Sequence, residues 1–219
     1  NLIVDLISLL KKKKFKIKVI YDCVQDYRFH PSTSKKLLIL EKQLAENSDI
    51  CISDSIINYN RLDSIKKKII PPGVDIDHFR IKKAKKITKE KINLLYYGNI
   101  RRDLDISLLN KISISKNIDL TLLGLMNLDN NELNKNIKVL NPVEYSHLPK
   151  YIKKFNALLL PYDTKNKFTE AIIPAKFFEC ICTGLPVIST KMKSTIDFHK
   201  YLTLIDENTN FDNLVINQL

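Results

Sequence analysis

The sequence has few of the residues that build metal centres, disulfide frameworks and membrane spans. Its 219 residues include no tryptophan, four cysteines and four histidines. The cysteines form no C-x-x-C pair and have no zinc-type spacing with the histidines, so we expect reduced, mostly buried thiols and no metal site. The apolar stretch 2–10 is too short to span a bilayer, and its lysines follow it, whereas those of a signal peptide come first. These absences predict a cytoplasmic protein.

Glycine is also scarce, because the chain has four where average usage would give roughly 15. A chain so poor in glycine keeps it where the backbone requires it. The four glycines, Gly73, Gly98, Gly124 and Gly184, all fall at the ends of expected strands or helices. We interpret Gly124 and Gly184 as ends of elements. Gly98 is interpreted as functional, because a strand, a glycine and the start of a helix form a common phosphate site.

Acidic residues are too few to balance the bases, and the formal net charge is +12. Lysine-rich stretches at 11–14, 66–68 and 82–86 carry much of this charge. Such stretches usually form a solvated face. No aromatic residues alternate with them and no nucleic-acid-binding motif is present, so we predict no nucleic-acid partner. A weak attraction to anionic membrane surfaces is the more plausible consequence, at the inner face of the membrane.

The order of apolar segments predicts an α/β fold with a doubly wound, Rossmann-like parallel sheet. Expected strands lie at 17–21, 49–53, 68–70, 92–97, 120–123, 137–140, 157–160, 187–190 and 201–206. Expected helices lie at 34–47 and 54–62 and begin near residues 103, 148, 174 and 210. The turn 71–75 has two prolines and a glycine, so we place a domain boundary there. The prediction is a first domain at 1–75, a basic linker at 76–91 and a second domain at 92–219.

The stretch 172–190 contains the strongest functional signal. Pro174 suits the first turn of a helix, and Lys176 and Glu179 lie one turn apart on one face of it. Gly184 can end that helix in the left-handed conformation, and the β-branched residues 187–190 then form a strand. A helix N-terminus with a lysine beside it and a carboxylate one turn deeper suits a phosphate that carries a sugar hydroxyl. The alternative is a surface ion pair between Lys176 and Glu179.

Two further sets of polar residues are candidates at expected strand ends. Arg101 and Arg102 follow Gly98, although exposed arginines beside a loop are common. Asp22 and Asp26 follow the strand at 17–21, where open α/β sheets place groups that contact ligands. These aspartates either face an active cleft or serve as turn-forming and helix-capping carboxylates, and the sequence favours neither.

Taken together, the order of these residues resembles GT-B fold retaining glycosyltransferases of the family 4-like, or group 1, type. The matching residues are Tyr21, Asp22, Asp26, Glu41, Asp49, Ser53, Gly73, Val74, Asp75, Phe79, Pro174, Lys176, Glu179, Gly184, Pro186, Val187, Ser189 and Thr190. The resemblance covers nearly the whole chain, which begins with Asn1 rather than methionine. We therefore expect a piece of a longer protein, with the closing part of an N-terminal acceptor-side domain and most of a C-terminal donor domain.

The resemblance implies that a nucleotide diphosphate sugar binds the second domain and is transferred to a saccharide or lipid-linked acceptor in polysaccharide or glycoconjugate biosynthesis. Glu179 would hold the ribose hydroxyls. Lys176 with Arg101 or Arg102 would be the catalytic cations that neutralise the leaving diphosphate, and Gly98 and Pro174 would contribute backbone amides. No cofactor or metal is expected, because cationic side chains take that role.

The chain departs from the family pattern at two positions. Ala171 stands where many relatives have a second glutamate, which places the sugar specificity in question, and Asn141 stands where a glycine is usual. Two other functions remain open at this point: a nucleotide-sugar epimerase of related architecture, and a non-catalytic binding module. A product assay would separate transferase from epimerase, and salt-dependent oligonucleotide binding would favour the module.

Overall fold

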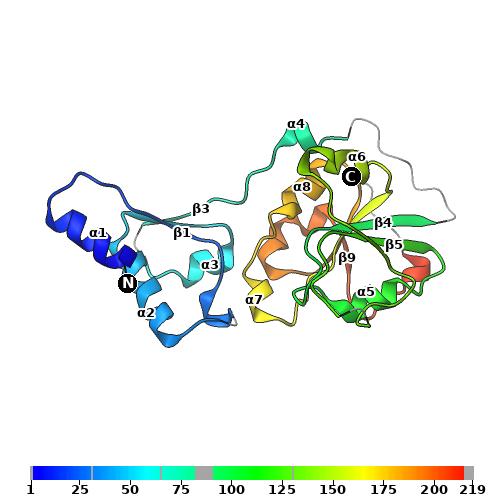
Figure 1. Cartoon of the computed structure of the whole chain (residues 1–219), viewed down its shortest axis with the longest axis horizontal. Coiled ribbons are helices and arrows are strands. Elements are labelled where there is room, and N and C mark those ends of the chain that lie inside the picture. Colours follow the sequence, from blue (N-terminus) through cyan, green and yellow to red (C-terminus); the bar gives the residue numbers. More distant parts are fainter. Residues whose placement is uncertain (1, 31, 65, 82–90, 130, 215–219) are drawn as a thin grey trace. The chain divides into compact units, whose positions relative to one another are not determined.

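The computed structural model describes residues 2–30, 32–64, 66–81, 91–129 and 131–214. The chain divides into two compact units. The first comprises Asn1–Pro72 with Lys167–Ile173, and the second comprises Gly73–Asn166 with Pro174–Leu219. Figure 1 labels the elements of both units. Most of the expected basic linker lies outside the described residues, and its first part forms the short helix α4.

The first unit contains a parallel sheet with the strand order β1-β2-β3 among its described residues. Its elements are α1 (Leu2–Lys12), β1 (Ile20–Cys23), η1 (Tyr27–Phe29), α2 (Lys35–Asn47), β2 (Ile50–Ser53), α3 (Ile56–Arg61), β3 (Lys67–Ile69) and α7 (Lys167–Glu170). Ser34 and Ser55 cap α2 and α3 by accepting backbone N–H groups, as expected at helix N-termini. A small core of Tyr21, Cys23, Ala45, Cys51 and Leu62 lies between the sheet and its helices.

The second unit contains a larger parallel sheet with the order β6-β5-β4-β7-β8-β9 in the part of the chain that the structure describes. Its strands are β4 (Ile92–Tyr97), β5 (Ile118–Leu123), β6 (Lys138–Leu140), β7 (Ala157–Leu160), β8 (Val187–Thr190) and β9 (Thr203–Ile205). Its helical elements are α4 (Ile76–Phe79), α5 (Ile106–Ile112), η2 (Tyr145–His147), α6 (Leu148–Ile152), α8 (Lys176–Cys182), η3 (Lys193–Tyr201) and η4 (Phe211–Asn213).

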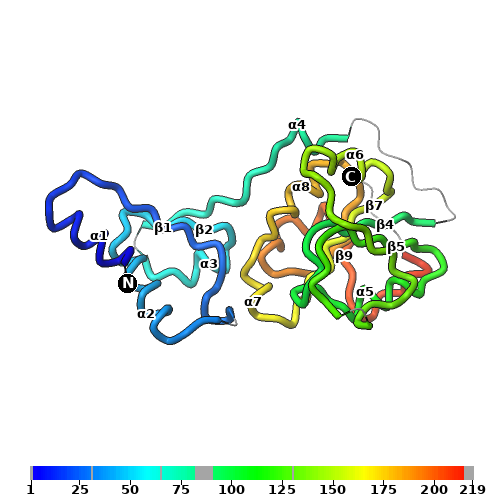
Figure 2. The backbone as a smooth tube through the Cα atoms, viewed as in Figure 1, coloured from blue at the N-terminus to red at the C-terminus, as the bar shows by residue number. Residues whose placement is uncertain are grey.

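The strand order of this sheet reverses between β4 and β7. From β4 the chain continues outward to β5 and β6, then returns to place β7 on the other side of β4. In Figure 2 the backbone can be followed through this return. Open α/β sheets bind ligands at such a switch point, outside the carboxyl ends of the strands. The predicted doubly wound parallel fold is confirmed, and the switch point shows where to search for a site.

Several element boundaries differ from the expected ones. β1 begins at Ile20, three residues late, because Val19 is engaged in bonds to Asp49 before the ladder with β2 begins. The helix expected from residue 103 begins at Ile106, since Asp105 is its cap. The helix expected from residue 210 is a single 3-10 turn over 211–213, and residues 215–219 lie outside the described part.

No helix within the described ranges is long and apolar enough to cross a membrane.

Candidate functional site

The candidate site lies where β4 ends, on the switch-point side of the second sheet. Gly98 directly follows β4 and has a φ of 121°, a value that favours glycine. A side chain there would also displace the flexible end of Lys176, because an added Cβ would lie 2.1 Å from its Nζ. The missing side chain of Gly98 thus lets the ammonium of Lys176 lie against the backbone.

Gly124, at the end of the neighbouring strand β5, also serves close packing. A Cβ at Gly124 would lie 1.9 Å from the carbonyl oxygen of Gly98, and the N–H of Gly98 donates to Leu123 O at 2.8 Å. The loop after β4 therefore lies directly on the end of β5. Gly124 was expected only to end a strand, but its missing side chain also makes room for Gly98.

Lys176, from the first turn of α8, is the central cation of the site. Its Nζ donates to the hydroxyl of Tyr96 at 2.9 Å and lies 4.3 Å from the centroid of the same ring. The ring centroids of Tyr97 and Tyr162 lie 6.0 and 5.9 Å from the same nitrogen. Among the described residues no carboxylate lies within ion-pair distance of this ammonium. A cation surrounded by aromatic rings is stabilised by their π faces, but it lacks a charged partner.

Burial is the main influence on the charge of Lys176. It lowers the pKa of the ammonium to about 8, and the carboxylates of Asp103 and Glu179 offset only part of that shift. The half-buried ammonium loses part of its hydration without gaining a paired anion in exchange. The arrangement therefore favours an anionic ligand that would supply the missing charge.

Glu179 lies one turn further along α8 and has different partners from Lys176. Its Oε2 accepts a hydrogen bond from the hydroxyl of Tyr97 at 3.1 Å. Burial raises the pKa of Glu179, although the Tyr97 bond and the charge of Lys176 oppose the shift. Because Lys176 and Glu179 bind different tyrosines, the alternative of a surface ion pair between them does not describe this site. A half-buried carboxylate with one oxygen engaged can still accept hydroxyl groups with the other.

Two aromatic rings lie beside Glu179. The rings of His78 and Tyr145 are stacked, with centroids 4.4 Å apart and an interplanar angle of 12°. His78 is additionally bonded to the backbone of Tyr145, with 3.0 Å between Nε2 and the carbonyl oxygen. Desolvation raises the pKa of the Tyr145 hydroxyl, and the carboxylate of Glu179 raises it further. Tyr145 is 54% exposed, so part of its ring is open to a ligand.

The two candidate arginines have different surroundings. Arg101 pairs with Asp103, with 2.8 Å between nitrogen and oxygen, and its charge contributes to the lowered pKa of Lys176. Arg102 instead pairs with Glu132 at 3.5 Å and is 76% exposed on its side chain. The geometry thus associates Arg101 with the Lys176 cluster and Arg102 with a neighbouring loop.

Pro174 lies just before α8, and its carbonyl accepts the N–H of Phe177 at 2.8 Å. Ala175, at the cap position, makes no side-chain capping bond. Since α8 has seven residues, its dipole is short, and we attribute the positive character of the site mainly to the lysine.

The two cleft candidates belong to the first unit. Asp26 is 1% exposed, accepts the N–H of Arg28 as the cap of η1, and pairs with the side chains of Arg28 at 2.6 Å and Arg61 at 3.5 Å. These contacts fit the capping alternative. Asp22 is exposed on β1.

Three residues of the site were not singled out from the sequence, namely Tyr96, Tyr97 and Tyr145. In the sequence, Tyr96 and Tyr97 are only the last two residues of an expected strand. In the structure they are buried, with 1% and 6% exposure. Their position directly before Gly98 was the one available indication. Two Asp-x-Asp sequences, at 75–77 and 103–105, also occur, but Asp75 and Asp105 cap α4 and α5. Among the described residues no group of three or more His, Cys, Asp or Glu could hold a metal ion.

No family model and no curated protein sequence matches the chain. Solved structures do match. Sucrose-phosphate synthase from Thermosynechococcus elongatus is 15% identical with a TM-score of 0.67, over 92% of this chain and 58% of that one. HepE from Anabaena in complex with UDP is 12% identical with a TM-score of 0.69, over 95% of this chain and 63% of that one. WaaG, a glycosyltransferase involved in lipopolysaccharide biosynthesis, is 14% identical with a TM-score of 0.58, over 94% of this chain and 69% of that one.

These neighbours are GT-B glycosyltransferases. The chain spans about three fifths of the length of the first two. Likeness at this level of identity describes architecture, and it agrees with the strand order and switch point found above. The chain therefore has a doubly wound α/β fold of the GT-B type.

Proposed function

We propose that this chain is the nucleotide-sugar-binding part of a retaining glycosyltransferase, which transfers a sugar from a nucleoside diphosphate sugar to a saccharide or lipid-linked acceptor in polysaccharide or glycoconjugate biosynthesis. One observation carries the proposal: the half-buried ammonium of Lys176 lies against Gly98 at the switch point, without a carboxylate partner. A diphosphate would supply that partner. The fold supports the proposal, because HepE of the same architecture was solved with UDP and with UDP-glucose.

The chemistry of transfer follows from where negative charge develops. When the bond between the sugar and the diphosphate breaks, charge accumulates on the departing phosphate oxygen. Lys176 would stabilise that charge from a half-buried position, where electrostatic interactions are stronger than in bulk water. Arg101 would add a second cation from the loop after Gly98. Arg102, held by Glu132, is left out of this role.

The nucleoside end of the donor would lie toward Glu179 and Tyr145. The free oxygen of Glu179 would accept the ribose hydroxyls. The base would stack on the exposed part of the Tyr145 ring, which His78 holds in place from its other side. The binding mode uses side chains and backbone only, so we propose that no metal or cofactor is required.

The cellular location of the protein is part of the same proposal. The four cysteines are free, which suits a cytoplasmic protein. The lysines 11–14 form the end of α1 and the residues directly after it, and Leu2 and Ile3 on the same helix are exposed at 86% and 60%. A weak association with an anionic membrane surface is compatible with these residues. No observation favours nucleic acid as a partner.

The proposal is tested by titrating the chain with uridine, guanosine, thymidine and adenosine diphosphate sugars in calorimetry. We expect selective binding to one nucleotide class. Lys176→Met should abolish that binding, and Glu179→Ala should weaken it at least tenfold, about the value of one charged hydrogen bond. Lys150→Met is the matched control, because Lys150 is an exposed lysine on α6 whose loss changes the net charge equally.

The outcomes separate the proposal from its alternatives. Equal binding by Lys176→Met and by wild type would contradict the site. With an acceptor present, release of the nucleoside diphosphate and a glycosylated product with the donor's anomeric configuration would support a retaining transferase. An interconverted sugar nucleotide without acceptor would instead show an epimerase.

A further inference from the structure

Asp103, in the loop after β4, is a carboxylate that the proposed function leaves without a role. Its Oδ2 accepts a hydrogen bond from the Nε of Arg101 at 2.9 Å, and the Nη2 of the same guanidinium lies 2.8 Å away. The side chain of Asp103 is 15% exposed, whereas that of Arg101 is 55% exposed. Two nitrogens on one carboxylate oxygen restrict the guanidinium more than a single contact does, so Asp103 determines how Arg101 is oriented.

The other carboxylate oxygen of Asp103 is buried. Oδ1 has no hydrogen-bond partner among the residues that the structure describes. Burying a polar atom without satisfying it is unfavourable, and an atom retained in this state needs an explanation beyond local hydrogen bonding. Attraction to a nearby cation is such an explanation, because it requires charge but no direct contact.

The backbone holds Asp103 in a fixed place beside the end of β7. Leu104 forms an antiparallel bridge with Tyr162, the second residue after β7. Next to this bridge, the N–H of Asp163 donates to the carbonyl of Asp103 at 3.0 Å. The ring centroid of Tyr162 lies 5.9 Å from the Nζ of Lys176. The loop that carries Asp103 is therefore attached to a residue whose ring lies near Lys176.

The charged and titratable groups that the structure places around Lys176 belong to the second unit. They come from β4, from the loop after it, from the residues after β7 and from α8, and they are Tyr96, Tyr97, Arg101, Asp103, Tyr162, Glu179 and Cys180. Burial raises the pKa of the Cys180 thiol to about 12, so the thiol is uncharged where Lys176 titrates. Burial also raises the pKa values of the three tyrosine hydroxyls, which stay neutral. Within the described residues, the negative charge around Lys176 therefore comes from the carboxylates of Asp103 and Glu179.

Asp103 and Arg101 have opposite effects on Lys176. Burial lowers the pKa of the Lys176 ammonium to about 8, the carboxylate of Asp103 opposes that shift, and the guanidinium of Arg101 adds to it. Glu179 also opposes the shift, but one of its oxygens is occupied by the hydroxyl of Tyr97. Asp103 thus interacts with both candidate cations, with Arg101 by direct contact and with Lys176 through its charge.

We propose that Asp103 is a positioning residue, the shared counter-charge that keeps Arg101 oriented and Lys176 protonated at the end of β4 before a donor binds. Two nearby cations repel each other, and a carboxylate that attracts both offsets this repulsion. A bound diphosphate would then take over as the partner of both cations. Asp103 would not contact that ligand, because its free oxygen is buried. Effects on anion binding rest on the proposed function, whereas the effect on the protonation of Lys176 does not.

The test follows the protonation of Lys176 directly, without a donor. The 219-residue chain is prepared with ¹³C-labelled lysine, and the Cε resonances are titrated by NMR from about pH 6 to about pH 10. Lys176→Met identifies the resonance of Lys176 by its absence. We expect Asp103→Asn to move the titration midpoint of Lys176 to lower pH by about 0.5–1 unit, because loss of a neighbouring negative charge favours the neutral amine. The shift is smaller than the roughly 1–3 units seen between charges in direct contact.

Asp105→Asn is the matched control, because it changes the net charge equally in the same loop. The Oδ1 of Asp105 caps α5 by accepting the N–H of Leu108 at 2.9 Å, and asparagine caps helices equally well. This variant should leave the midpoint of Lys176 unchanged. Arg101→Met, at an exposed position, should move the midpoint to higher pH, since Lys176 loses a repelling charge and Asp103 loses its other partner.

Binding of inorganic pyrophosphate, measured by calorimetry over the same pH range, connects the charge of Lys176 to the proposed function. Affinity should fall in the alkaline range, and Asp103→Asn should move the midpoint of that fall to lower pH by the same amount as in the NMR titration. The readout is this midpoint rather than the affinity at neutral pH, because the variant also removes a carboxylate that repels an anion.

The outcomes separate the role of Asp103 from the proposed function. An unchanged Lys176 midpoint in Asp103→Asn would overturn the proposal, and so would an equal shift in Asp105→Asn. If Asp103→Asn folds poorly, Arg101→Met decides, because an unchanged midpoint there would show that the charges of this loop do not reach Lys176. Failure of wild type to bind pyrophosphate would contradict the proposed function, while the NMR titration would still decide the role of Asp103.

Discussion

Lys176 has a lowered pKa and lies where the proposed site requires an anionic ligand. Below about pH 8 its ammonium stays charged in the folded protein, and its burial then lowers the free energy of unfolding. As the pH rises from about 8 toward 10.5, the ordinary value for lysine, the folded state has already lost the proton while the unfolded chain still holds it. The unfolded state then binds more protons, so this contribution to stability increases over that window.

Donor binding should show the opposite trend, because the diphosphate requires the charged form. Above about pH 8 the free protein must take up a proton to bind, so affinity should fall by up to about tenfold per pH unit. Calorimetry between pH 7 and pH 10 would measure this. Lys176→Arg keeps its charge throughout and should have a flat profile over the same range. Identical profiles for the two proteins would show that another group controls binding.

Gly98 allows a second prediction at the same scale. Gly98→Ala would place a side chain at a φ of 121° and displace the Lys176 ammonium from Tyr96. We expect a loss of about 1–3 kcal/mol in stability from backbone strain. Donor affinity should fall as well. Urea unfolding and calorimetry would measure the two effects.

Gly73→Ala provides the comparison for that variant. An added Cβ at Gly73 meets nothing within 4 Å. It should change stability by no more than about 0.5 kcal/mol and leave affinity unchanged. If Gly98→Ala behaved like Gly73→Ala, the close approach of Lys176 to the backbone would have no functional meaning.

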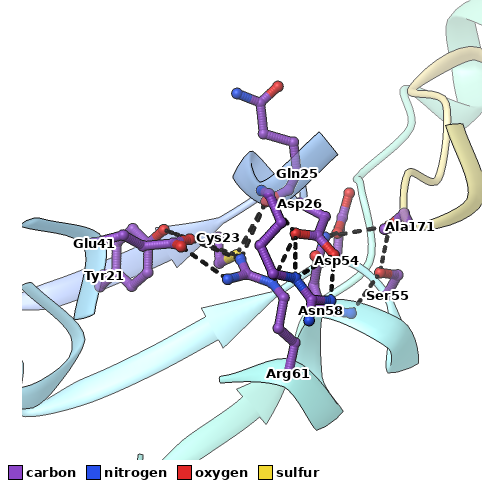
Figure 3. Close-up of polar contacts among 11 residues, drawn as sticks. Tyr21, Cys23, Gln25, Asp26, Glu41, Asp54, Ser55, Asn58, Arg61 and Ala171 are labelled. Atoms are coloured by element: carbon purple, nitrogen blue, oxygen red, sulfur yellow. Dashed lines mark hydrogen bonds and ion pairs between the residues drawn. The ribbon is translucent and has the colours of Figure 1, made fainter. Parts of the chain in front are cut away.

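At the scale of elements, a buried ion network joins β1, α2 and α3 in the first unit (Figure 3). Arg61 binds Glu41 through two nitrogens at 2.7 and 2.8 Å, and Glu41 also accepts from Tyr21 at 2.8 Å. The side chains of Arg61 and Glu41 are 10% and 8% exposed. Their charges are thus largely removed from water, where loss of one partner leaves the other uncompensated.

Arg61→Met should therefore destabilise the first unit by about 3–5 kcal/mol. Arg102→Met removes a similar arginine whose ion pair with Glu132 is exposed, and should cost no more than about 1 kcal/mol. Urea unfolding of the two variants, followed by hydrogen exchange in β1 and β2, would measure the difference. Equal losses would mean that the buried network adds nothing beyond a surface pair.

The elements differ in how far the sequence predicted them. The strands 92–97, 157–160 and 187–190 were predicted to the residue. The run 157–160 is continuously apolar, as expected of a strand buried on both faces. The run 92–97 is apolar or aromatic apart from Asn93, and 187–190 is rich in β-branched residues, which favour strands. The 3-10 segment 193–201 has no such pattern and was missed. The residues of the candidate site also differ in how far the sequence predicted them. Lys176 and Glu179 stand out by type and spacing, whereas the bonds that Tyr96 and Tyr97 make to them depend on packing.

At the scale of the whole molecule, the sequence could not show which unit each segment joins. Residues 92–219 were expected to form one domain, but 167–173 pack with the first unit. The bond from Ser55 to Ala171 crosses 116 residues of sequence, and no local pattern specifies so distant a partner. Whether a segment returns to an earlier unit is decided by tertiary contacts, which propensity and periodicity do not describe.

This division into units leads to a prediction about ligand-induced stability. A bound ligand stabilises only the part of the chain that unfolds together with the binding site. At a ligand concentration of 100 times the Kd, the free energy of unfolding of that part rises by about 2.7 kcal/mol. All donor-binding candidates on α8 and at the end of β4 belong to the second unit. We therefore expect a nucleoside diphosphate at this excess to raise hydrogen-exchange protection of β4, β7 and β8 by up to this amount, and that of β1, β2 and β3 by much less. Lys176→Met should show no gain in either unit. Equal gains in both sheets of the wild type would show instead that the two units unfold as one cooperative body, because the free energy of binding would then be shared by every residue that opens with the site.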